Sequence, residues 1–409
     1  MAGSGPTGRT GLSDLHLSVD RPASGELVAP AAPAAPARAL HARLPGHAPS
    51  ALRDAPELAA ELGVGKVWLK DEAGRFGLPS FKPLGASWAV CRAIAELLGD
   101  TKPPEDLDDL RERAAALRPL RLVCATDGNH GRSVAYVAAL LGLEAEVVVP
   151  PGTARARIDA IAAEGAHVQI VDGDYDAAQR RSAELAEGGR GLLVSDMSWP
   201  GNERIPAWVA EGYGTIFAEL EEQLAAARRA STADDSAAAG STVGGSAVDV
   251  AFVPVGVGAL AAAAVEHLAP RGVRLVSVEP EDAACALGSA RAGEPVSVPG
   301  PHRSSMAGLN CGTVSMIAWP ALQQMDAFCS IADDAAEWGV RRLAELGLDR
   351  GECAGGVLGA AREMLAGDRA PEFREALGLG PDAVVLLLLT EGVTDPEHFQ
   401  RITGRPPRR

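Results

Sequence analysis

Short apolar runs alternate with helix-length amphipathic segments through most of the chain. From Arg121 onward the order is RLVCA, GRSVAYVAALLG, AEVVVP, TARARIDAIAAEG, HVQIVD, YDAAQRRSAELAEG and GLLVS, and the pattern resumes with VDVAFVPVG, GALAAAAVEHLA and VRLVSVEP. This alternation predicts βαβ units and a parallel sheet. The near-continuous apolar run AVVLLLLTEG, residues 383–392, predicts a strand buried on both faces in the middle of a helix-covered sheet.

Charge and composition narrow the classes of function. The 409 residues allow more than one domain, and a net charge of −16 argues against nucleic acid or an anionic membrane surface as partner, because either requires a cationic face. No apolar run reaches the roughly 20 residues needed to span a bilayer, and no signal peptide is visible. The six cysteines are scattered singly, without metal-ligand spacing. We therefore expect a cytoplasmic enzyme that acts on a small molecule and holds no metal.

Two segments depart from the alternating pattern. Residues 1–45 are rich in Pro and Ala, with the stretch APAAPAAPARA, and predict a disordered extension because closely spaced prolines prevent a continuous helix or strand. Residues 228–247 are small and of low complexity, and predict a surface loop.

Lys82 lies in the stretch GRFGLPSFKPLGAS, at the predicted start of a helix with Ser80 as N-cap. The positive end of the helix dipole disfavours a cation there and should lower the pKa of the amine, which suits a lysine that forms imines. The chain has only four lysines among 38 basic residues. Because arginine supplies most of the cationic side chains, a lysine here is more often present for the chemistry of its amine, which arginine cannot replace. The alternative is an ordinary exposed lysine.

A second group of polar residues stands in ATDGNHGRSVA, residues 125–135, between an apolar strand and a helix. Open α/β sheets bind ligands at this point, beyond the carboxyl ends of their strands. Asp127, Asn129 and His130 supply a carboxylate, an amide and an imidazole there. The alternative is a turn made of turn-forming residues.

Two further strand ends carry features of a ligand site. The segment VPVGVGALAAA predicts a strand, a glycine loop and a helix whose first backbone amides could hold a phosphate, although close packing explains the glycines as well. Those loop residues are Gly256, Val257, Gly258, Ala259 and Leu260. Thr390 and Glu391 follow the most apolar strand and should face a crevice, unless they form a turn without a ligand.

An imine-forming lysine, an amide, a phosphate loop and a neutral hydroxyl are what pyridoxal phosphate requires of a protein. The segments KDEAGRFGLPSFKPLGAS, TDGNHGRSVA, SDMSWPGNERIPAWVAEGY, PVGVGAL, SSMAGLNCG, GECAGG and LLTEGVTD resemble the fold type II pyridoxal-phosphate enzymes, the tryptophan synthase β-like superfamily. Within it the nearest likeness is to the diaminopropionate ammonia-lyases. Asp127 favours them over the related serine and threonine dehydratases, which typically have a serine-containing version of this turn.

This resemblance implies an α/β fold of two open, twisted, mostly parallel sheets covered by helices, with the active site between two domains. Residues 46–90 and 206–409 would form the large cofactor-binding domain, and residues 91–205 the small one. The resemblance also implies a homodimer.

The resemblance further implies a role for each site residue. Lys82 would bind pyridoxal 5'-phosphate as an imine, Asn129 its 3'-oxygen, the Gly256–Leu260 loop its phosphate, and Thr390 its pyridine nitrogen. Asp127 and Lys82 would stand on opposite faces of the substrate, so that both enantiomers can lose the α-proton, and Asp196 would receive the distal ammonium. The alternatives are turn or cap roles for both aspartates and a structural role for His130.

The reaction implied is α,β-elimination of 2,3-diaminopropionate to pyruvate and ammonia. A serine or threonine dehydratase and a β-replacement enzyme are alternatives, and a non-catalytic binding protein is a remote one, since a pure binder has no use for Lys82. The sequence departs from the ammonia-lyases at Pro200-Gly201-Asn202 and at Cys353, where a serine is usual. These departures leave the identity of the amino acid open.

Overall fold

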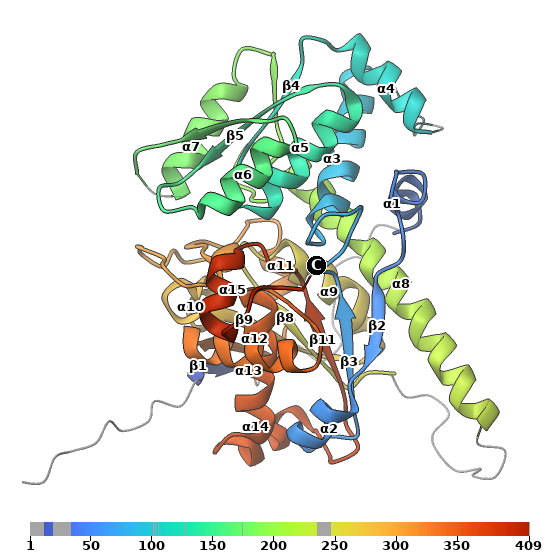
Figure 1. The fold of residues 1–409 in the computed structure, drawn as a ribbon, viewed down its shortest axis with the longest axis vertical. Coiled ribbons are helices and arrows are strands. Elements are labelled where there is room, and N and C mark those ends of the chain that lie inside the picture. The colour runs from blue at the N-terminus through green and yellow to red at the C-terminus, as the bar shows by residue number, and fades with distance from the viewer. Residues whose placement is uncertain are drawn as a thin grey trace, which may run out of the picture.

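The computed structural model describes residues 12–18, 34–100, 102, 104, 106–126, 128–173, 175–234 and 247–408. They form two lobes, each with its own β-sheet, and Figure 1 shows the smaller lobe above the larger one.

The large lobe contains a seven-stranded sheet in the order β1-β10-β9-β8-β11-β3-β2. Its strands are β1 (Leu12–Leu17), β2 (Ala51–Asp54), β3 (Lys66–Asp71), β8 (Val250–Pro254), β9 (Arg274–Pro280), β10 (Ala327–Ile331) and β11 (Val384–Leu389). The five inner strands are parallel, and β1 and β2 are antiparallel edges. The run of leucines forms β11, which pairs with β8 and β3 and is buried from Val385 to Leu389. The prediction of an interior strand is confirmed.

The small lobe contains four parallel strands in the order β6-β5-β4-β7. They are β4 (Arg121–Ala125), β5 (Glu144–Val149), β6 (His167–Ile170) and β7 (Gly191–Leu193), with helices α4 (Leu107–Ala116), α5 (Asn129–Leu141), α6 (Arg155–Ala163) and α7 (Tyr175–Ala186) around them. Val147 packs in the cluster that contains α5, and the next residue, Val148, packs with Ala178 of α7. Helices therefore cover both faces of this sheet.

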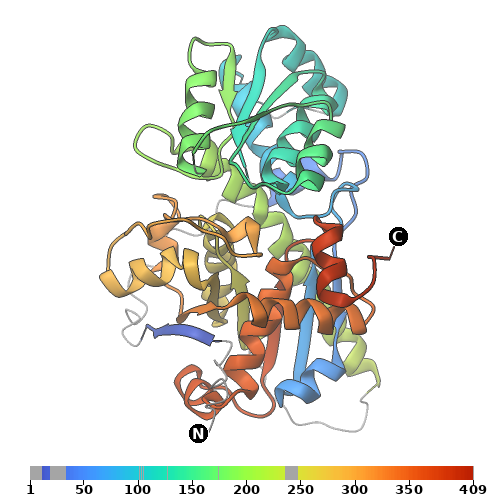
Figure 2. The same ribbon diagram turned by 60° about the vertical axis from the view of Figure 1, so that its left-hand side comes forward.

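Helices of the large lobe surround its sheet (Figures 1 and 2). They are α2 (Pro56–Leu62), α8 (Arg204–Asp234), α9 (Ala259–Leu268), α10 (Cys285–Ala292), α11 (Trp319–Leu322), α12 (Asp333–Glu345), α13 (Glu352–Ala366), α14 (Ala370–Leu377) and α15 (Pro396–Thr403). Helices α1 (Ala34–His41) and α3 (Lys82–Leu97) instead pack in the hydrophobic cluster of the small lobe. Helices α3 and α8 cross closely at two glycines, because a Cβ atom on Gly212 would lie 2.6 Å from the Leu84 oxygen and one on Gly85 would lie 2.6 Å from Tyr213. This contact fixes the first turn of α3, where Lys82 stands. Among the described helices, none is both long and apolar enough to cross a membrane.

Two sequence predictions need correction. Strand β1 and helix α1 fall within residues 1–45, so the predicted disorder is wrong for these segments; residues 1–11 and 19–33 lie outside the described part. Strand β1 adds an edge to β10, and α1 buries Ala37 and Leu40. Helix α8 continues to Asp234, because its alanine-rich end favours a helix, so the predicted loop is wrong over residues 228–234. Residues 235–246 are not described.

Candidate active site

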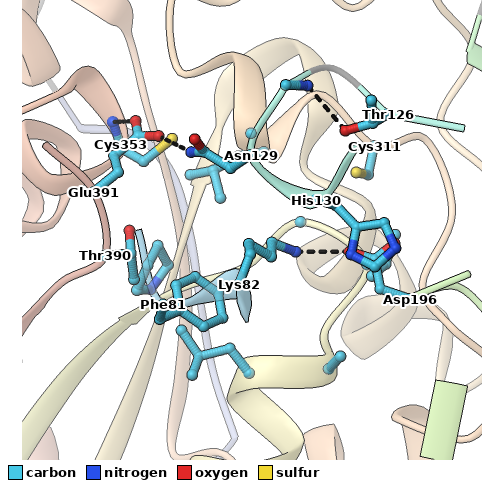
Figure 3. A pocket seen from close by; sticks show the side chains of 18 of the residues that line it. Phe81, Lys82, Thr126, Asn129, His130, Asp196, Cys311, Cys353, Thr390 and Glu391 are labelled. Atoms are coloured by element: carbon cyan, nitrogen blue, oxygen red, sulfur yellow. Dashed lines mark hydrogen bonds and ion pairs between the residues drawn. The ribbon is translucent and has the colours of Figure 1, made fainter. Parts of the chain in front are cut away.

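A pocket lies where the carboxyl ends of strands from both sheets meet. Asp196 follows β7 and Asn129 follows β4 in the small lobe, whereas Gly256 follows β8 and Thr390 follows β11 in the large lobe. Together with Lys82 they line a space of about 760 Å³, counting its open mouth. Figure 3 shows the side chains that face it.

Lys82 is the first residue of α3 and points into the pocket (Figure 3). The N-cap is Phe81, whereas Ser80, predicted as the cap, pairs through its backbone with Glu391. The Lys82 Nζ atom donates a hydrogen bond to Asp196 Oδ2 at 2.6 Å. The side chain of Lys82 is 18% exposed and that of Asp196 is 8% exposed, so the ion pair is nearly closed off from bulk water.

This ion pair determines the charge state of both partners. Burial lowers the pKa of Lys82, but the attraction of Asp196 outweighs it and holds the pKa of the amine above its ordinary value. Burial acts to raise the pKa of Asp196, yet the charge and hydrogen bond of Lys82 bring it below its usual range. The prediction that the pKa of Lys82 is lowered is therefore wrong, because a full charge at 2.6 Å exceeds the partial charges of a helix end.

Asn129 begins α5, and its Nδ2 donates to Glu391 Oε2 at 2.6 Å. The other carboxylate oxygen of Glu391 accepts from the backbone N–H of Cys353 at 3.3 Å, in the first turn of α13. Burial raises the pKa of the Glu391 carboxyl. Glu391 thus links the small lobe to the large lobe at the pocket wall. Its place next to Thr390 at the strand end indicated a crevice, but no sequence signal connected it to Asn129.

The loop from Gly256 to Leu260 leads from β8 into α9. Gly258 has a φ of +97°, which favours glycine, and a Cβ atom there would lie 2.8 Å from Leu322 Cδ1. A Cβ atom on Gly256 would lie 3.0 Å from the Gly308 oxygen. The loop is thus closely packed, and its residues also line the pocket, where the N-terminus of α9 favours an anion. Close packing therefore explains the glycines, and phosphate binding by the loop stays a prediction.

The structure brings together all but one of the residues predicted for the site. Lys82, Asn129, Asp196, the Gly256–Leu260 loop and Thr390 all line the pocket, and Thr390 is buried. Asp127 lies outside the described residues; its neighbours Thr126 and Gly128 line the pocket. His130 and Glu391, which the sequence placed at ligand-facing strand ends without a binding role, also line it. Tyr175 and Cys311 line it too and were not among the predicted site residues.

The two departures from the ammonia-lyase pattern lie in different surroundings. Cys353 lines the pocket. Residues Trp199 to Asn202 form a tight turn, in which the Asn202 N–H donates to the Trp199 oxygen at 2.8 Å and Gly201 has a φ of +93°. Proline and glycine suit the two central positions of such a turn. None of these four residues lines the pocket within the described part of the chain.

The residues present fit pyridoxal phosphate, since a pocket-facing amine, a glycine loop at a helix start, an amide and a strand-end hydroxyl converge. A family profile described as "Pyridoxal-phosphate dependent enzyme" matches residues 43–391. The chain belongs to this family.

Known members of the pyridoxal-phosphate family resemble this chain over nearly its whole length. The diaminopropionate ammonia-lyase of Escherichia coli K12 is 32% identical over 90% of each chain, and that of Salmonella typhimurium LT2 is 34% identical over 89% of this chain and 90% of its own length. The crystal structure of the Escherichia coli diaminopropionate ammonia-lyase in complex with D-serine superposes with a TM-score of 0.80, at 29% identity, covering 95% of this chain and 96% of that one. The likeness therefore extends over both lobes.

Proposed function

We propose that this chain is a pyridoxal-phosphate-dependent ammonia-lyase that eliminates ammonia from 2,3-diaminopropionate and yields pyruvate. The observation that carries the proposal is the buried carboxylate of Asp196, which faces the pocket and holds an alkylammonium group at 2.6 Å. A 2,3-diamino acid brings a second alkylammonium group, which serine and threonine lack. The likeness to diaminopropionate ammonia-lyases over about 90% of the chain agrees with this choice.

Lys82 has two tasks in this proposal. Its amine would hold the cofactor, and in its free, neutral form the same amine would take the α-proton of the L-isomer. Bound pyridoxal phosphate supplies the electron sink that makes this proton acidic. The hydroxyl of Thr390, rather than a carboxylate, faces the pyridine nitrogen in this proposal and favours prompt elimination. Asp127 would take the α-proton of the D-isomer from the opposite face.

Asp196 holds the distal amine as an ammonium group. A buried carboxylate without a countercharge is unfavourable, so Asp196 would require another cation whenever the Lys82 ammonium group is not beside it. The substrate's distal ammonium restores the pair and leaves as ammonia when the Cβ–N bond breaks. The enamine released then hydrolyses to pyruvate and a second ammonia. Asn129 and the Gly256–Leu260 loop keep the cofactor oriented through its 3'-oxygen and its phosphate.

Two experiments test the proposal. Purified protein with added pyridoxal phosphate should show imine absorbance, and borohydride should trap the cofactor on Lys82. L- and D-2,3-diaminopropionate, L-serine and L-threonine are then each supplied, and pyruvate, 2-oxobutyrate and ammonia are measured. We expect pyruvate and ammonia from the diamino acid at far higher kcat/KM than from serine. Keto acid from serine but none from the diamino acid would make the chain a dehydratase.

The homodimer and the cytoplasmic location implied by the sequence are part of this proposal. Gel filtration with light scattering tests the first, and fractionation of the source cells tests the second.

A further inference from the structure

His130 is a buried side chain with one ring nitrogen aimed at the active-site ion pair. It is the second residue of α5 and is 4% exposed. Its Nε2 atom lies 2.7 Å from the Val194 carbonyl oxygen, at the end of β7. Its Nδ1 atom has no hydrogen-bond partner among the described residues, and it lies 3.8 Å from Asp196 Oδ2. Figure 3 shows His130 next to Asp196 in the pocket wall.

The bond to Val194 determines which nitrogen carries the proton. A carbonyl oxygen only accepts, so Nε2 must carry the hydrogen and donate it. Burial lowers the pKa of His130, against the opposing effect of Asp196, so the ring is neutral near pH 7. In this tautomer Nδ1 is a lone-pair acceptor. His130 Nδ1 and Asp196 Oδ2 lie 3.8 Å apart, and both accept hydrogen bonds. Because buried acceptors are paired in stable proteins, these two require a donor that lies close to both.

We infer that His130 Nδ1 and Asp196 together form a two-acceptor subsite that selects the distal ammonium of a 2,3-diamino acid. This inference rests on the proposed function and assigns His130 a part in its specificity. Lys82 Nζ, a primary alkylammonium, is bonded to Asp196 at 2.6 Å, and His130 lies next to this pair. The distal ammonium of the substrate is the same chemical group and takes this place once Lys82 is engaged.

The subsite discriminates by the number of donors. An alkylammonium has three N–H donors and a full charge, so it can satisfy the Nδ1 lone pair and the carboxylate at once. The hydroxyl of serine has a single donor and can satisfy only one of them. A methyl group satisfies neither. Buried acceptors left without a donor cost affinity, so both analogues should bind less tightly than the diamino acid.

Two substitutions separate this role from a purely structural one. In His130→Gln, the amide nitrogen can still donate to Val194, but the acceptor at the Nδ1 position is lost. In His130→Asn, the shorter amide can place an oxygen near the Nδ1 position, while the bond to Val194 is lost. The specificity role predicts that Asn recovers part of what Gln loses, whereas a structural role predicts the reverse order.

The test uses the holoenzyme and two ligands of nearly equal shape, L-2,3-diaminopropionate and L-2-aminobutyrate, in which a methyl group replaces the distal ammonium. Stopped-flow absorbance gives the dissociation constant of each before turnover. We expect His130→Gln to reduce the preference for the diamino acid roughly 10- to 100-fold, the usual effect of losing a hydrogen bond to a charged group. The constant for L-2-aminobutyrate should change less than about threefold, within the factor expected when no such bond is lost.

Asp196→Asn provides a second variant should His130→Gln not fold. It should reduce the same preference, and the double variant should lose less than the sum of the single losses, because the two acceptors share one donor. An unchanged preference in His130→Gln, equal weakening of both ligands, or additive losses in the double variant would overturn the inference. A wild-type protein that prefers the diamino acid but forms no pyruvate would overturn only the proposed reaction.

Discussion

Asp196→Asn should have opposite effects on cofactor uptake and on substrate turnover. Two unit charges 2.6 Å apart interact by about 6 kcal/mol at an effective dielectric constant of about 20. This attraction keeps Lys82 protonated in the ligand-free protein, and only the neutral amine can attack the aldehyde of pyridoxal phosphate. Asparagine removes the attraction and leaves burial, which lowers the pKa of the amine. Cofactor uptake at neutral pH should therefore become faster, by at least about tenfold.

The pH dependence of cofactor uptake shows whether Asp196 raises or lowers the pKa of Lys82. Because the pKa of Lys82 is raised in the wild type, the neutral fraction is small and increases about tenfold per pH unit between pH 7 and 10. In Asp196→Asn the profile should level off at lower pH. The assay mixes apoprotein with pyridoxal phosphate and follows imine absorbance across this range. Uptake that is no faster in the variant, with an unchanged pH profile, would refute the assignment of Asp196 as the group that holds the proton on Lys82.

Turnover of the diamino acid should fall in the same variant. A hydrogen bond between charged groups contributes about 1.5–3 kcal/mol, so kcat/KM for L-2,3-diaminopropionate should fall roughly 10- to 150-fold. The matched control is Asp71→Asn, another buried aspartate in ion pairs, with Arg53 and Arg350, which does not line the pocket among the described residues. It should alter stability and leave the pH profile of uptake unchanged.

Three other substitutions test separate features, two in the site and one in an ion pair outside the pocket lining. Asp127→Asn should lower activity on D-2,3-diaminopropionate at least about tenfold more than on the L-isomer; equal loss on both isomers would remove its role as the second base. Gly256→Ala should weaken cofactor binding about tenfold by fluorescence titration, because the added Cβ meets a backbone oxygen at 3.0 Å, whereas Gly380→Ala, with nothing within 4 Å, should not. A hydrogen bond to Glu352 raises the pKa of His398. The stability that this ion pair provides is therefore complete below about pH 6.5 and lost as pH rises through the raised pKa. His398→Gln should lower the free energy of unfolding by about 1 kcal/mol at pH 6 and by little at pH 9, measured by thermal unfolding.

Much of the site could be predicted because it is built at strand ends. Asn129, the Gly256 loop and Thr390 each follow a recognisable strand, and the carboxyl ends of parallel strands meet at one edge. Their convergence in one pocket therefore follows from the alternating pattern and from the resemblance. The interior position of β11 follows from its apolar sequence in the same way.

Other features depend on contacts between distant parts of the chain. Lys82 and Asp196 are 114 positions apart, so local reasoning from the helix dipole gave the wrong direction for the pKa of the amine. The bond between Asn129 and Glu391 joins positions 262 apart. Strand β1 forms only because β10 offers an unpaired edge, which composition does not reveal. In each case the deciding partner is set by tertiary packing.

The ion pair of Lys82 and Asp196 connects the charge of the free site with the choice of ligand in the proposed function. A cation at the start of α3 is opposed by the helix dipole and by burial, so Lys82 is stable there as a cation because Asp196 faces it. Asp196 in turn is buried and requires a cation in every state. In the proposed function the ligand would meet this requirement while Lys82 holds the cofactor, and the neutral ring of His130 would add an acceptor without adding a charge. A serine hydroxyl would leave this carboxylate uncompensated, whereas a distal ammonium meets its requirement, so the arrangement that protonates Lys82 in the free protein also favours a diamino acid.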